Sequence, residues 1–344
     1  MNTRNHVNPD AAAPACRTFS RRAVLAGLGL LAAGAGVLGY PLVRRAAQTP
    51  QPVFLARRQR YDGSLVRTIR DGLEAVEFDF AWVRGRRVLL KPNLVEPSPT
   101  APHVTTHPAV ILAAAEVLRQ AGAQVTVGEA SANLRDTELV LVESGLEDTL
   151  AGEKLPFADL NYSESRSVPN AGRATKLKEF FFPRAVLEAD LIVSLPKLKT
   201  HHWAGFTASM KNLYGLLPGI VYGWPKNVLH YVGIPGSIVD IAASAPQTIA
   251  IVDAILSMEG DGPIMGTPKP LGLIAVGLNP TAVDATLARI IGLDPFKVPY
   301  LSLAAGRLGP IADREILQRG EPWQPLVDRF KTLDLPELKA MRAR

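Results

Sequence analysis

The sequence is nearly free of cysteine: Cys16 is the only one among 344 residues, and it lies close to the N-terminus. The rest of the chain therefore has no disulfide, no thiolate metal site, no iron–sulfur cluster and no cysteine nucleophile. An excess of charge is also missing beyond residue 45, since that part holds 32 basic and 31 acidic residues. The net charge of +6 thus belongs to the N-terminal segment and gives no reason to expect a nucleic-acid partner.

Three common motifs of catalytic and nucleotide-binding sites are missing from residues 49–344 as well. No GxGxxG follows the first expected strand, and the chain has neither GxxxxGK[ST] nor GxSxG. These absences remove the usual sequence support for a dinucleotide oxidoreductase, a P-loop nucleotidase and a serine hydrolase. With 47% apolar and 20% charged residues, the chain nevertheless has the composition of a folded globular protein.

The N-terminal segment resembles a twin-arginine export signal. Arg21-Arg22 precedes residues 23–43, which carry no charge. A basic stretch that stays in the cytoplasm and an apolar stretch that enters the bilayer are the parts of such a signal. We expect residues 1–48 to engage the twin-arginine export machinery, which would place the body in the periplasm or anchor it to the outer face of the cytoplasmic membrane.

Two features of this segment stay open. An ordinary membrane anchor with a chance arginine pair is the alternative to an export signal. Cleavage is also undecided, because Ala46-Ala47 follows two arginines rather than forming a clean cleavage site. In either case the sequence predicts that the protein meets a membrane only through this segment, since the apolar stretches of the body are too short to span a bilayer.

The body, residues 49–344, alternates between strand and helix patterns without a linker or repeat. Apolar runs typical of strands occur at 53–56, 88–90, 124–127, 191–195, 249–252 and 273–276, and helical spacing occurs at 64–77, 108–121, 206–216 and 280–291. This order predicts a single α/β domain with a mostly parallel sheet, helices on both faces and Rossmann-like layering. We expect its core to span about residues 50–310 and the more polar residues 311–344 to form an appendage.

Polar side chains follow four of the expected strands at the point where each ends. Lys91 and Glu129 follow two early strands, and the segment 196–202 and Asp253 follow two later ones. Because ligands of open parallel sheets bind outside the carboxyl ends of the strands, we expect these groups to share one pocket. Its anion clamp would consist of Lys91, Asn93, Lys197, Lys199, Lys211 and Asn212, and its catalytic groups would be His201, Asp253 and Glu259.

The segment 196–202 carries most of this argument. In an extended chain, Lys197, Lys199 and His201 point to one side with a period of two residues. Two ammonium groups beside an imidazole form a receptor for a phosphate or carboxylate. A helix expected to begin near Thr207 would add its free N–H groups to the same anion site. The alternative is that the lysines are solvated and that the histidines are ordinary surface residues.

A divalent metal is a further cofactor that these residues would suit, because carboxylates facing a basic pocket can hold Mg²⁺ or Ca²⁺ with an anionic ligand. The candidate ligands are Asp253, Glu259, Asp284, His202 and His230. No histidine spacing matches a compact metal motif, and the loop 259–266 lacks the spacing of an EF-hand. For Asp284 the alternative is a favourable interaction with the helix dipole. The sequence identifies no particular metal or cofactor.

Several of these segments together resemble the domain-of-unknown-function 362 family over roughly residues 50–310. The matching segments are 90–94 (LKPNL), 105–108 (TTHP), 189–192 (ADLI), 196–201 (PKLKTH), 210–215 (MKNLYG), 252–253 (VD), 258–263 (MEGDGP) and 282–285 (AVDA). The resemblance implies an α/β fold and no established reaction. Many members carry a ferredoxin-like cysteine-rich module, from which this chain departs because Cys16 alone cannot ligate a cluster.

A weaker similarity reaches the nickel-dependent lactate racemase superfamily, in which a His-x-x-Ala-Gly segment, a lysine and Leu-Pro-Gly line a cofactor pocket. The similar residues here are 201–205 (HHWAG), Lys211 and 217–219 (LPG), with His230 beyond them. The glycine pair before the lysine in that superfamily is replaced by Ser209-Met210. The similarity therefore supports the place of the site and does not imply racemase chemistry.

Two kinds of function fit these residues. We expect an exported enzyme that acts on a small phosphate- or carboxylate-bearing substrate, with or without a metal or cofactor. The alternative is a non-catalytic extracytoplasmic protein that binds an anionic ligand or cofactor. Both need the lysine clamp, and only the enzyme needs an acid or base placed as we expect for His201.

Overall fold

A ten-stranded sheet organises the computed structural model, which describes residues 50–131 and 136–343. Its strands follow the order β12-β1-β11-β10-β7-β2-β3-β4, and β8 and β9 branch from β10. The strand bounds are β1 (Gln51–Ala56), β2 (Arg87–Pro92), β3 (Gln124–Glu129), β4 (Phe157–Asp159), β7 (Leu191–Leu195), β8 (Lys197–His201), β9 (Gly205–Thr207), β10 (Thr248–Glu259), β11 (Thr267–Gly277) and β12 (Ile316–Gly320). A separate hairpin pairs β5 (Ser165–Pro169) with β6 (Glu179–Pro183).

The centre of the sheet is parallel, which confirms the predicted fold class. Strands β10, β7, β2, β3 and β4 pair in parallel in that order, and β8 pairs in parallel with β10. Within the described sheet, β11, which runs antiparallel to β1 and β10, and the short β9, which runs antiparallel to β8, depart from this direction. The carboxyl ends of the central strands therefore meet at one edge, where open α/β sheets bind their ligands.

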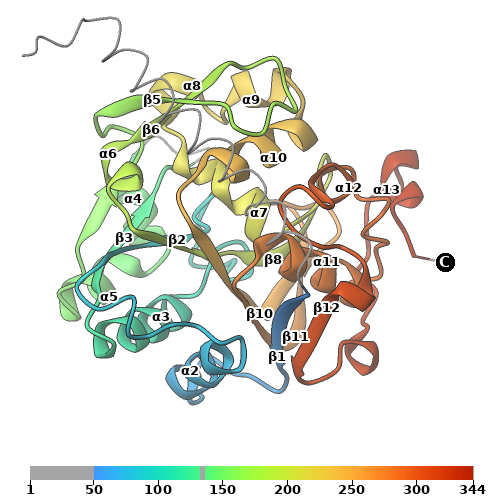
Figure 1. Cartoon of the computed structure of the whole chain (residues 1–344), viewed down its shortest axis with the longest axis horizontal. Coiled ribbons are helices and arrows are strands. Elements are labelled where there is room, and N and C mark those ends of the chain that lie inside the picture. The colour runs from blue at the N-terminus through green and yellow to red at the C-terminus, as the bar shows by residue number, and fades with distance from the viewer. Residues whose placement is uncertain (1–49, 132–135, 344) are drawn as a thin grey trace, which may run out of the picture. The chain divides into compact units, whose positions relative to one another are not determined.

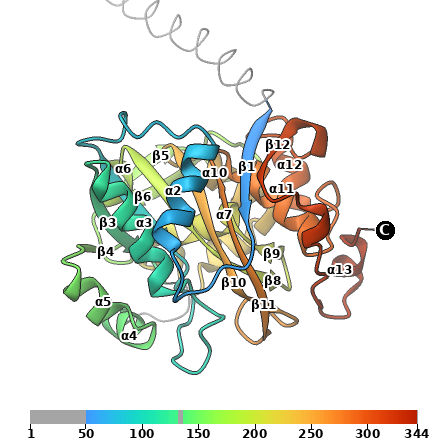
Figure 2. The same cartoon turned by 90° about the horizontal axis from the view of Figure 1, so that it is seen from below.

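Helices cover both faces of the sheet, as predicted. The face packed with α2 to α5 is distinct from the face packed with α7, α10, α11 and α12, and Figure 2 shows the strands lying between α3 and α11. The bounds on the first face are α2 (Leu65–Ala75), α3 (Pro108–Gln120), α4 (Thr137–Glu143) and α5 (Leu146–Gly152). The other helices are α6 (Arg184–Leu187), α7 (Ser209–Asn212), α8 (Gly219–Tyr222), α9 (Asn227–Tyr231), α10 (Ile234–Ser244), α11 (Pro280–Ile290), α12 (Pro299–Ala304) and α13 (Pro336–Ala340), with single 3₁₀ turns η1 (Leu213–Leu216), η2 (Asp313–Glu315) and η3 (Gln324–Leu326).

Local side chains set the starts of two helices. The Nδ1 atom of His107 accepts a hydrogen bond of 3.1 Å from the Ala109 N–H at the start of α3. The Oδ1 atom of Asn279 accepts one of 3.0 Å from the Ala282 N–H at the start of α11. Each cap satisfies an N–H group that has no partner inside the helix, and a proline with its fixed φ follows each cap.

The region 206–216 differs from the single helix that its apolar spacing predicts. Its first residues end β9, and the two short turns α7 and η1 follow. The Ser209 and Met210 N–H groups at the start of α7 donate to the Asp284 carboxylate at 2.7 and 3.0 Å. The anion site that we predicted at this helix start is therefore wrong, because a carboxylate of the protein already occupies it.

The C-terminal residues are joined more closely to the sheet than an appendage would be. Strand β12 pairs in parallel with β1 at the sheet edge, and Figure 1 shows it in red beside the blue β1. Phe330, Leu338 and Met341 lie in the same apolar core as the helices of the second face. Among residues 50–131 and 136–343, no helix has the length and apolar character to cross a bilayer. The expected export segment, residues 1–48, lies outside the described residues.

Candidate functional site

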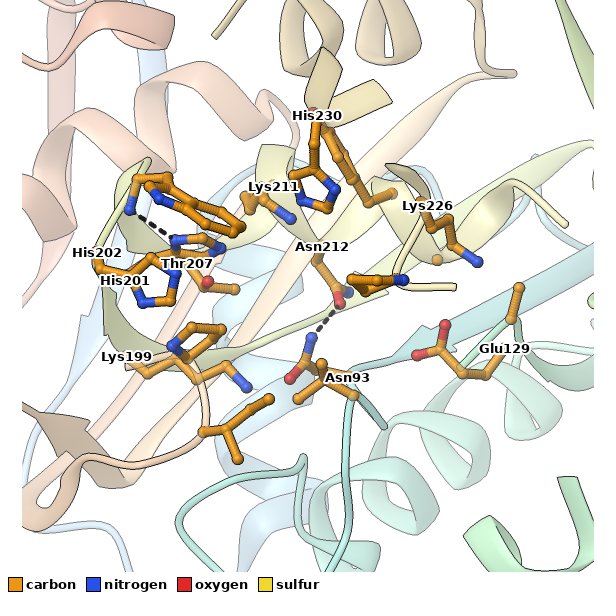
Figure 3. A pocket seen from close by; sticks show the side chains of 18 of the residues that line it. Asn93, Glu129, Lys199, His201, His202, Thr207, Lys211, Asn212, Lys226 and His230 are labelled. Atoms are coloured by element: carbon orange, nitrogen blue, oxygen red, sulfur yellow. Dashed lines mark hydrogen bonds between the residues drawn. The ribbon is translucent and has the colours of Figure 1, made fainter. Parts of the chain in front are cut away.

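A cavity of about 210 Å³ lies at the carboxyl edge of the central strands, and Figure 3 shows side chains converging on it from β2, β3, β8 and the segment that contains α7 and α9. Polar groups in its lining are Lys91, Asn93, Glu129, Lys199, His201, His202, Thr207, Lys211, Asn212, Lys226 and His230. Aromatic and apolar groups complete it, among them Trp203, Tyr214, Pro225 and Ile264. The cavity thus contains five members of the predicted clamp and the predicted catalytic residue His201.

Lys91 enters the cavity as a closed ion pair. It is fully buried at the end of β2, and its Nζ donates to Glu129 Oε2 at 2.7 Å and to the Pro92 carbonyl at 2.5 Å. The same carboxylate oxygen accepts from the Leu94 N–H at 3.0 Å. Gly215 permits this arrangement, because a Cβ at that position would lie 2.0 Å from Glu129 Oε1 and 2.5 Å from Lys91 Nζ. The negative charge of Glu129 is therefore largely neutralised by Lys91.

Two asparagines connect β2 to α7 beside this pair. Asn93 Nδ2 donates to Asn212 Oδ1 at 3.1 Å, the contact drawn as a dashed line in Figure 3. Asn212 Nδ2 donates to the Lys91 carbonyl at 2.9 Å and to Ser194 Oγ at 3.1 Å. Asn93 Oδ1 is buried and has no hydrogen-bond partner among the described residues. It is therefore an acceptor available to a ligand that carries a donor group.

Three further lysines reach the cavity without a carboxylate partner in the described part of the chain. Lys199 Nζ donates to the Val104 carbonyl at 2.8 Å, and Lys211 Nζ lies 3.8 Å from the centre of the Tyr214 ring. Lys226 Nζ is buried and makes no hydrogen bond. Unbalanced cations in a buried site are costly, so their convergence indicates that an anion normally completes the site.

Burial and mutual repulsion lower the pKa of all three lysines. The pKa of Lys211 falls to about 7, mainly because of burial and next because of the charge on Lys226. Burial lowers the pKa of Lys226 to about 7 as well, against the opposing effect of Glu129. Burial, followed by the charge on Lys211, holds the pKa of Lys199 well below its usual value. A bound anion would favour the charged form of each lysine and raise these pKa values again.

His201 is held as a neutral hydrogen-bond donor. It is 4% exposed, and its Nδ1 accepts from the N–H groups of Trp203 and Ala204 at 3.1 and 3.4 Å. Because Nδ1 is an acceptor, the ring hydrogen is assigned to Nε2. Burial and, next, the charge on Lys211 keep the pKa of His201 well below its usual value. The residue therefore offers the cavity a neutral N–H donor.

An aromatic wall closes one side of the cavity. Trp203 is 58% exposed, and its ring centre lies 4.4 Å from that of His202 and 5.3 Å from that of His230. Burial and, next, the charge on Lys211 lower the pKa of His230 to about 4, so this imidazole is neutral at neutral pH. His202 lies 3.7 Å from the Asp261 carboxylate. The wall gives the cavity an aromatic side.

The structure separates Lys197 and Asp253 from this cavity. Both are fully buried, and Lys197 Nζ donates to Asp253 Oδ2 at 2.7 Å and to the Tyr61 hydroxyl at 2.9 Å. Tyr61 donates to Asp253 Oδ1 at 3.0 Å, and the His107 N–H donates to Oδ2 at 3.0 Å. The pairing of β8 with β10 shifts between Asp253 and Met258, which explains why Lys197 and Lys199 do not share one pocket. The predicted roles of Lys197 as clamp and Asp253 as catalyst do not fit this closed cluster.

The other predicted carboxylates lie elsewhere as well. Glu259 Oε2 accepts from the Lys331 N–H at 2.9 Å, and Asp284 is buried beneath α7, where Tyr300 also donates to it at 3.0 Å. Burial raises the pKa of Asp284 to about 7. Among the residues that the structure describes, no group of three or more His, Cys, Asp or Glu side chains could hold a metal ion. The predicted metal candidates thus do not come together as a ligand set.

Several lining residues were not among the predicted site residues, and these include Glu129, Trp203, Tyr214 and Lys226. Glu129 ends a predicted strand, so its position was recognised although its role was not. Trp203 and Tyr214 lie within segments that were singled out for their histidines and lysine. Lys226 had no such signal, because it reaches the cavity from the segment between α8 and α9, where no strand end or motif marks it.

The fold and the cavity define an α/β protein with a lysine-lined cavity at the edge of its sheet. The chain belongs to the family described as domain of unknown function (DUF362), whose profile matches residues 88–289. A relative named thylakoid-associated protein sll1697, from Synechocystis sp. (strain ATCC 27184 / PCC 6803 / Kazusa), is 30% identical over 295 residues, which cover 83% of this chain and 88% of the relative.

A solved structure offers a more distant comparison. The lactate racemase apoprotein from Thermoanaerobacterium thermosaccharolyticum aligns with 72% of this chain at 14% identity and a TM-score of 0.44. The aligned part spans 58% of the racemase chain. Membership of the family thus rests on the profile match and on the relative from Synechocystis.

Proposed function

We propose that this protein is an enzyme acting on a small carboxylate- or phosphate-bearing substrate in the cavity at the sheet edge. The observation that carries the proposal is the convergence of Lys199, Lys211 and Lys226 without a carboxylate partner in the described chain. A small cavity of about 210 Å³ suits a small molecule better than a polymer. The apolar wall at Trp203 gives such a molecule a second surface to contact.

In this proposal the lining residues have separate roles in binding, charge stabilisation and proton transfer. Lys199 holds the anionic group, Lys226 adds a further positive charge to the cavity, and Asn93 Oδ1 accepts from a donor of the substrate. His201 donates through Nε2–H and stabilises negative charge that develops on the substrate during the reaction. Lys211, with a pKa of about 7, exists in both protonation states near neutral pH and is suited to move a proton. The pKa of about 7 for Lys211, which lines the same cavity as the N–H donor His201, favours an enzyme over a binding protein.

Binding is tested first, with acetate and inorganic phosphate as probes. We expect millimolar concentrations of either anion to raise the melting temperature of the wild-type protein, because ligands that bind the folded state stabilise it. The effect should be lost in Lys199→Met/Lys211→Met and kept in Lys176→Met, which removes an exposed lysine outside the cavity. If acetate and phosphate stabilise Lys199→Met/Lys211→Met as much as they stabilise the wild type, the anion site is refuted.

Turnover is tested by incubating the protein with a small-molecule extract of its own host and following the anions by mass spectrometry. We expect an anion to be consumed by the wild type and not by His201→Phe, which keeps an aromatic ring but has no N–H donor. If the variant retains thermal stabilisation by phosphate while turnover is lost, the enzyme is supported. If no anion is consumed but one is retained in native mass spectra, the protein is a binding protein.

We also propose that the twin-arginine segment exports the folded body to the periplasm or to the outer face of the membrane. The proposal rests on Arg21-Arg22 and the uncharged residues 23–43. Recognition of such a pair depends on guanidinium geometry and not on charge alone. We therefore expect Arg21→Lys/Arg22→Lys to remain in the cytoplasm in a fractionation experiment, and export at the wild-type level would show a general signal or anchor instead.

A further inference from the structure

We propose that the cavity selects a short anion with a negative group at each end, and that Lys226 is the residue that determines this selectivity. The inference rests on the proposed function, since it specifies the charge pattern of the same ligand. It follows from the number of unbalanced cations, from their separation across the cavity and from the way the chain holds Lys226.

The unbalanced cations outnumber what a single negative group can neutralise. Among the described residues that line the cavity, Glu129 is the only carboxylate, and Lys91 already binds it at 2.7 Å. Lys199, Lys211 and Lys226 remain. A ligand with one negative charge would leave two of these buried lysines without a counter-charge, whereas a doubly charged ligand leaves one. Burying uncompensated charge is costly, so the second negative group adds affinity.

The three lysines do not surround one point. Lys199 belongs to β8, Lys211 to α7, and Lys226 precedes α9. Figure 3 shows Lys199 and Lys226 on opposite sides of the cavity, with Lys211 off the line between them. Lys211 depresses the pKa of Lys199, and Lys226 depresses that of Lys211. Two separated negative groups match these separated cations better than one compact group does.

The backbone holds Lys226 in place at some cost. Its φ of 71° lies in the left-handed region, which a residue with a Cβ rarely adopts. Its N–H donates to the Gly223 carbonyl at 2.7 Å, and its own carbonyl accepts from the Leu229 N–H at 3.0 Å. Such backbone strain persists where the surroundings enforce it, often at ligand sites. Here the result is a lysine that is 1% exposed, lines the cavity and has no hydrogen-bond partner for its Nζ among the described residues.

The size and lining of the cavity suit a small ligand. Its volume is about 210 Å³. The aromatic wall at Trp203 and the apolar side chain of Ile264 line the space beside the lysines. A short carbon chain fits against them. We therefore place one negative group at Lys199 and His201, the other at Lys226, and the connecting carbons beneath Lys211.

Three probes separate charge number from charge placement. Succinate carries a negative group at each end, butyrate has the same chain length with one negative group, and methyl phosphate carries two charges on one compact group. Their affinities are measured by isothermal titration calorimetry with the full-length protein near neutral pH. The proteins compared are the wild type, Lys226→Met, Lys226→Arg and the exposed-lysine control Lys176→Met.

We expect the wild type and Lys176→Met to bind succinate at least about tenfold more tightly than butyrate, as the loss of one buried charge pair predicts. Succinate should also bind more tightly than methyl phosphate. In Lys226→Met the preference for succinate over butyrate should disappear while butyrate affinity is kept, and Lys226→Arg should restore part of the preference. Retained butyrate binding also shows that the Lys226→Met variant is folded.

The contrary results are distinct. Equal affinities of the wild type for succinate and butyrate, or tighter binding of methyl phosphate, would overturn the selectivity for end-to-end charges and leave the anion site intact. A succinate preference that survives in Lys226→Met would remove Lys226 from the selectivity. If none of the three probes binds the wild type, the proposed anion-binding function fails together with this inference.

Discussion

Lys197 and Lys199 are two residues apart on β8 and are both buried, yet their surroundings differ in every electrostatic respect. Lys197 lies in a closed cluster, where Asp253 and the Tyr61 hydroxyl accept from its Nζ. Lys199 has one backbone carbonyl as its acceptor and faces two other cations in a cavity. The comparison teaches that burial of a lysine alone does not mark a functional site. What distinguishes the cavity is the missing counter-charge.

The two regions also differ in how completely their buried polar groups are hydrogen-bonded. In the closed cluster, both carboxylate oxygens of Asp253 are engaged, by Lys197, Tyr61 and the His107 N–H. That cluster ties β8, β10 and the start of α3 together. In the cavity, Asn93 Oδ1 and Lys226 Nζ are buried without partners in the described chain. A fully satisfied network is a structural element, whereas unsatisfied groups that face a space await a ligand.

The largest effect is expected from breaking the closed cluster. Lys197→Met leaves the Asp253 carboxylate buried without its counter-charge, and the loss of one partner of a buried ion pair lowers the free energy of unfolding by about 3–5 kcal/mol. Lys199→Met is the matched variant two residues away, and because it removes an unbalanced cation we expect unchanged or greater stability. Urea unfolding followed by circular dichroism measures both.

A further variant checks the cause of that loss. Lys197→Met/Asp253→Leu removes both charges and should recover part of the stability that Lys197→Met loses, since an apolar pair needs no compensation. Equal destabilisation by Lys197→Met and Lys199→Met would contradict the comparison, because it would mean that Lys199 also has a counter-charge that stabilises the fold.

A smaller effect is expected at Gly215, where the paired lysine Lys91 borders the cavity. The added Cβ of Gly215→Ala would lie 2.0 Å from Glu129 Oε1, so the pair or the backbone must shift. Overpacking of this kind costs about 1–3 kcal/mol. Gly152→Ala is the control, because nothing lies within 4 Å of a Cβ at that position in α5.

Thermal or urea unfolding of the two alanine variants decides the matter. We expect Gly152→Ala to keep or raise stability, since alanine is favoured over glycine in helices. We expect Gly215→Ala to lower stability and to weaken phosphate binding, because a displaced Glu129 would approach the unpaired lysines and compete with the anion. Wild-type stability and binding in Gly215→Ala would show that η1 can move away without disturbing the pair.

Much of the fold follows from local patterns in the sequence. The ends of β2, β3 and β7 lie close to where the predicted apolar runs stop, and parallel pairing brings these ends together. Strand β10 instead continues to Glu259, so Asp253, which was predicted to follow a strand end, lies within the strand. Lys91, Lys199, Lys211, Asn93, Asn212 and His201 could be placed in one pocket from the strand ends and the segments near them. The helix caps at His107 and Asn279 also depend only on neighbours in the chain.

The remaining features depend on contacts between distant residues. The shift in pairing between β8 and β10 separates Lys197 from Lys199, and no alternation pattern in either strand announces it. Asp284 occupies the start of α7 from a helix more than 70 residues further along the chain. Lys226 reaches the cavity because of how the segment between α8 and α9 folds back, which the sequence alone does not encode in any periodic signal.

The smallest effect, and the one that sharpens the comparison most, is the pH dependence of anion binding. The pKa of Lys211 and of Lys226 is about 7 in the free protein because of burial, and a bound anion raises both values. Below pH 7 the lysines are already charged, so binding takes up no proton. Above pH 7 each must gain a proton when the anion binds, so the affinity for succinate should fall by up to about tenfold per pH unit for each proton taken up.

Calorimetry with succinate on both sides of pH 7, repeated in buffers of different ionisation enthalpy, counts these protons. The other titratable groups among the described lining residues are Lys91, Glu129, Lys199, His201, His202, Tyr214 and His230. His230, with a pKa of about 4, stays neutral through this range. We expect Lys226→Met to take up fewer protons than the wild type when succinate binds. Lys176→Met is the control and should take up as many protons as the wild type. An affinity that is constant or rises above pH 7 would mean that the cavity lysines remain charged without a ligand, as Lys197 does beside Asp253.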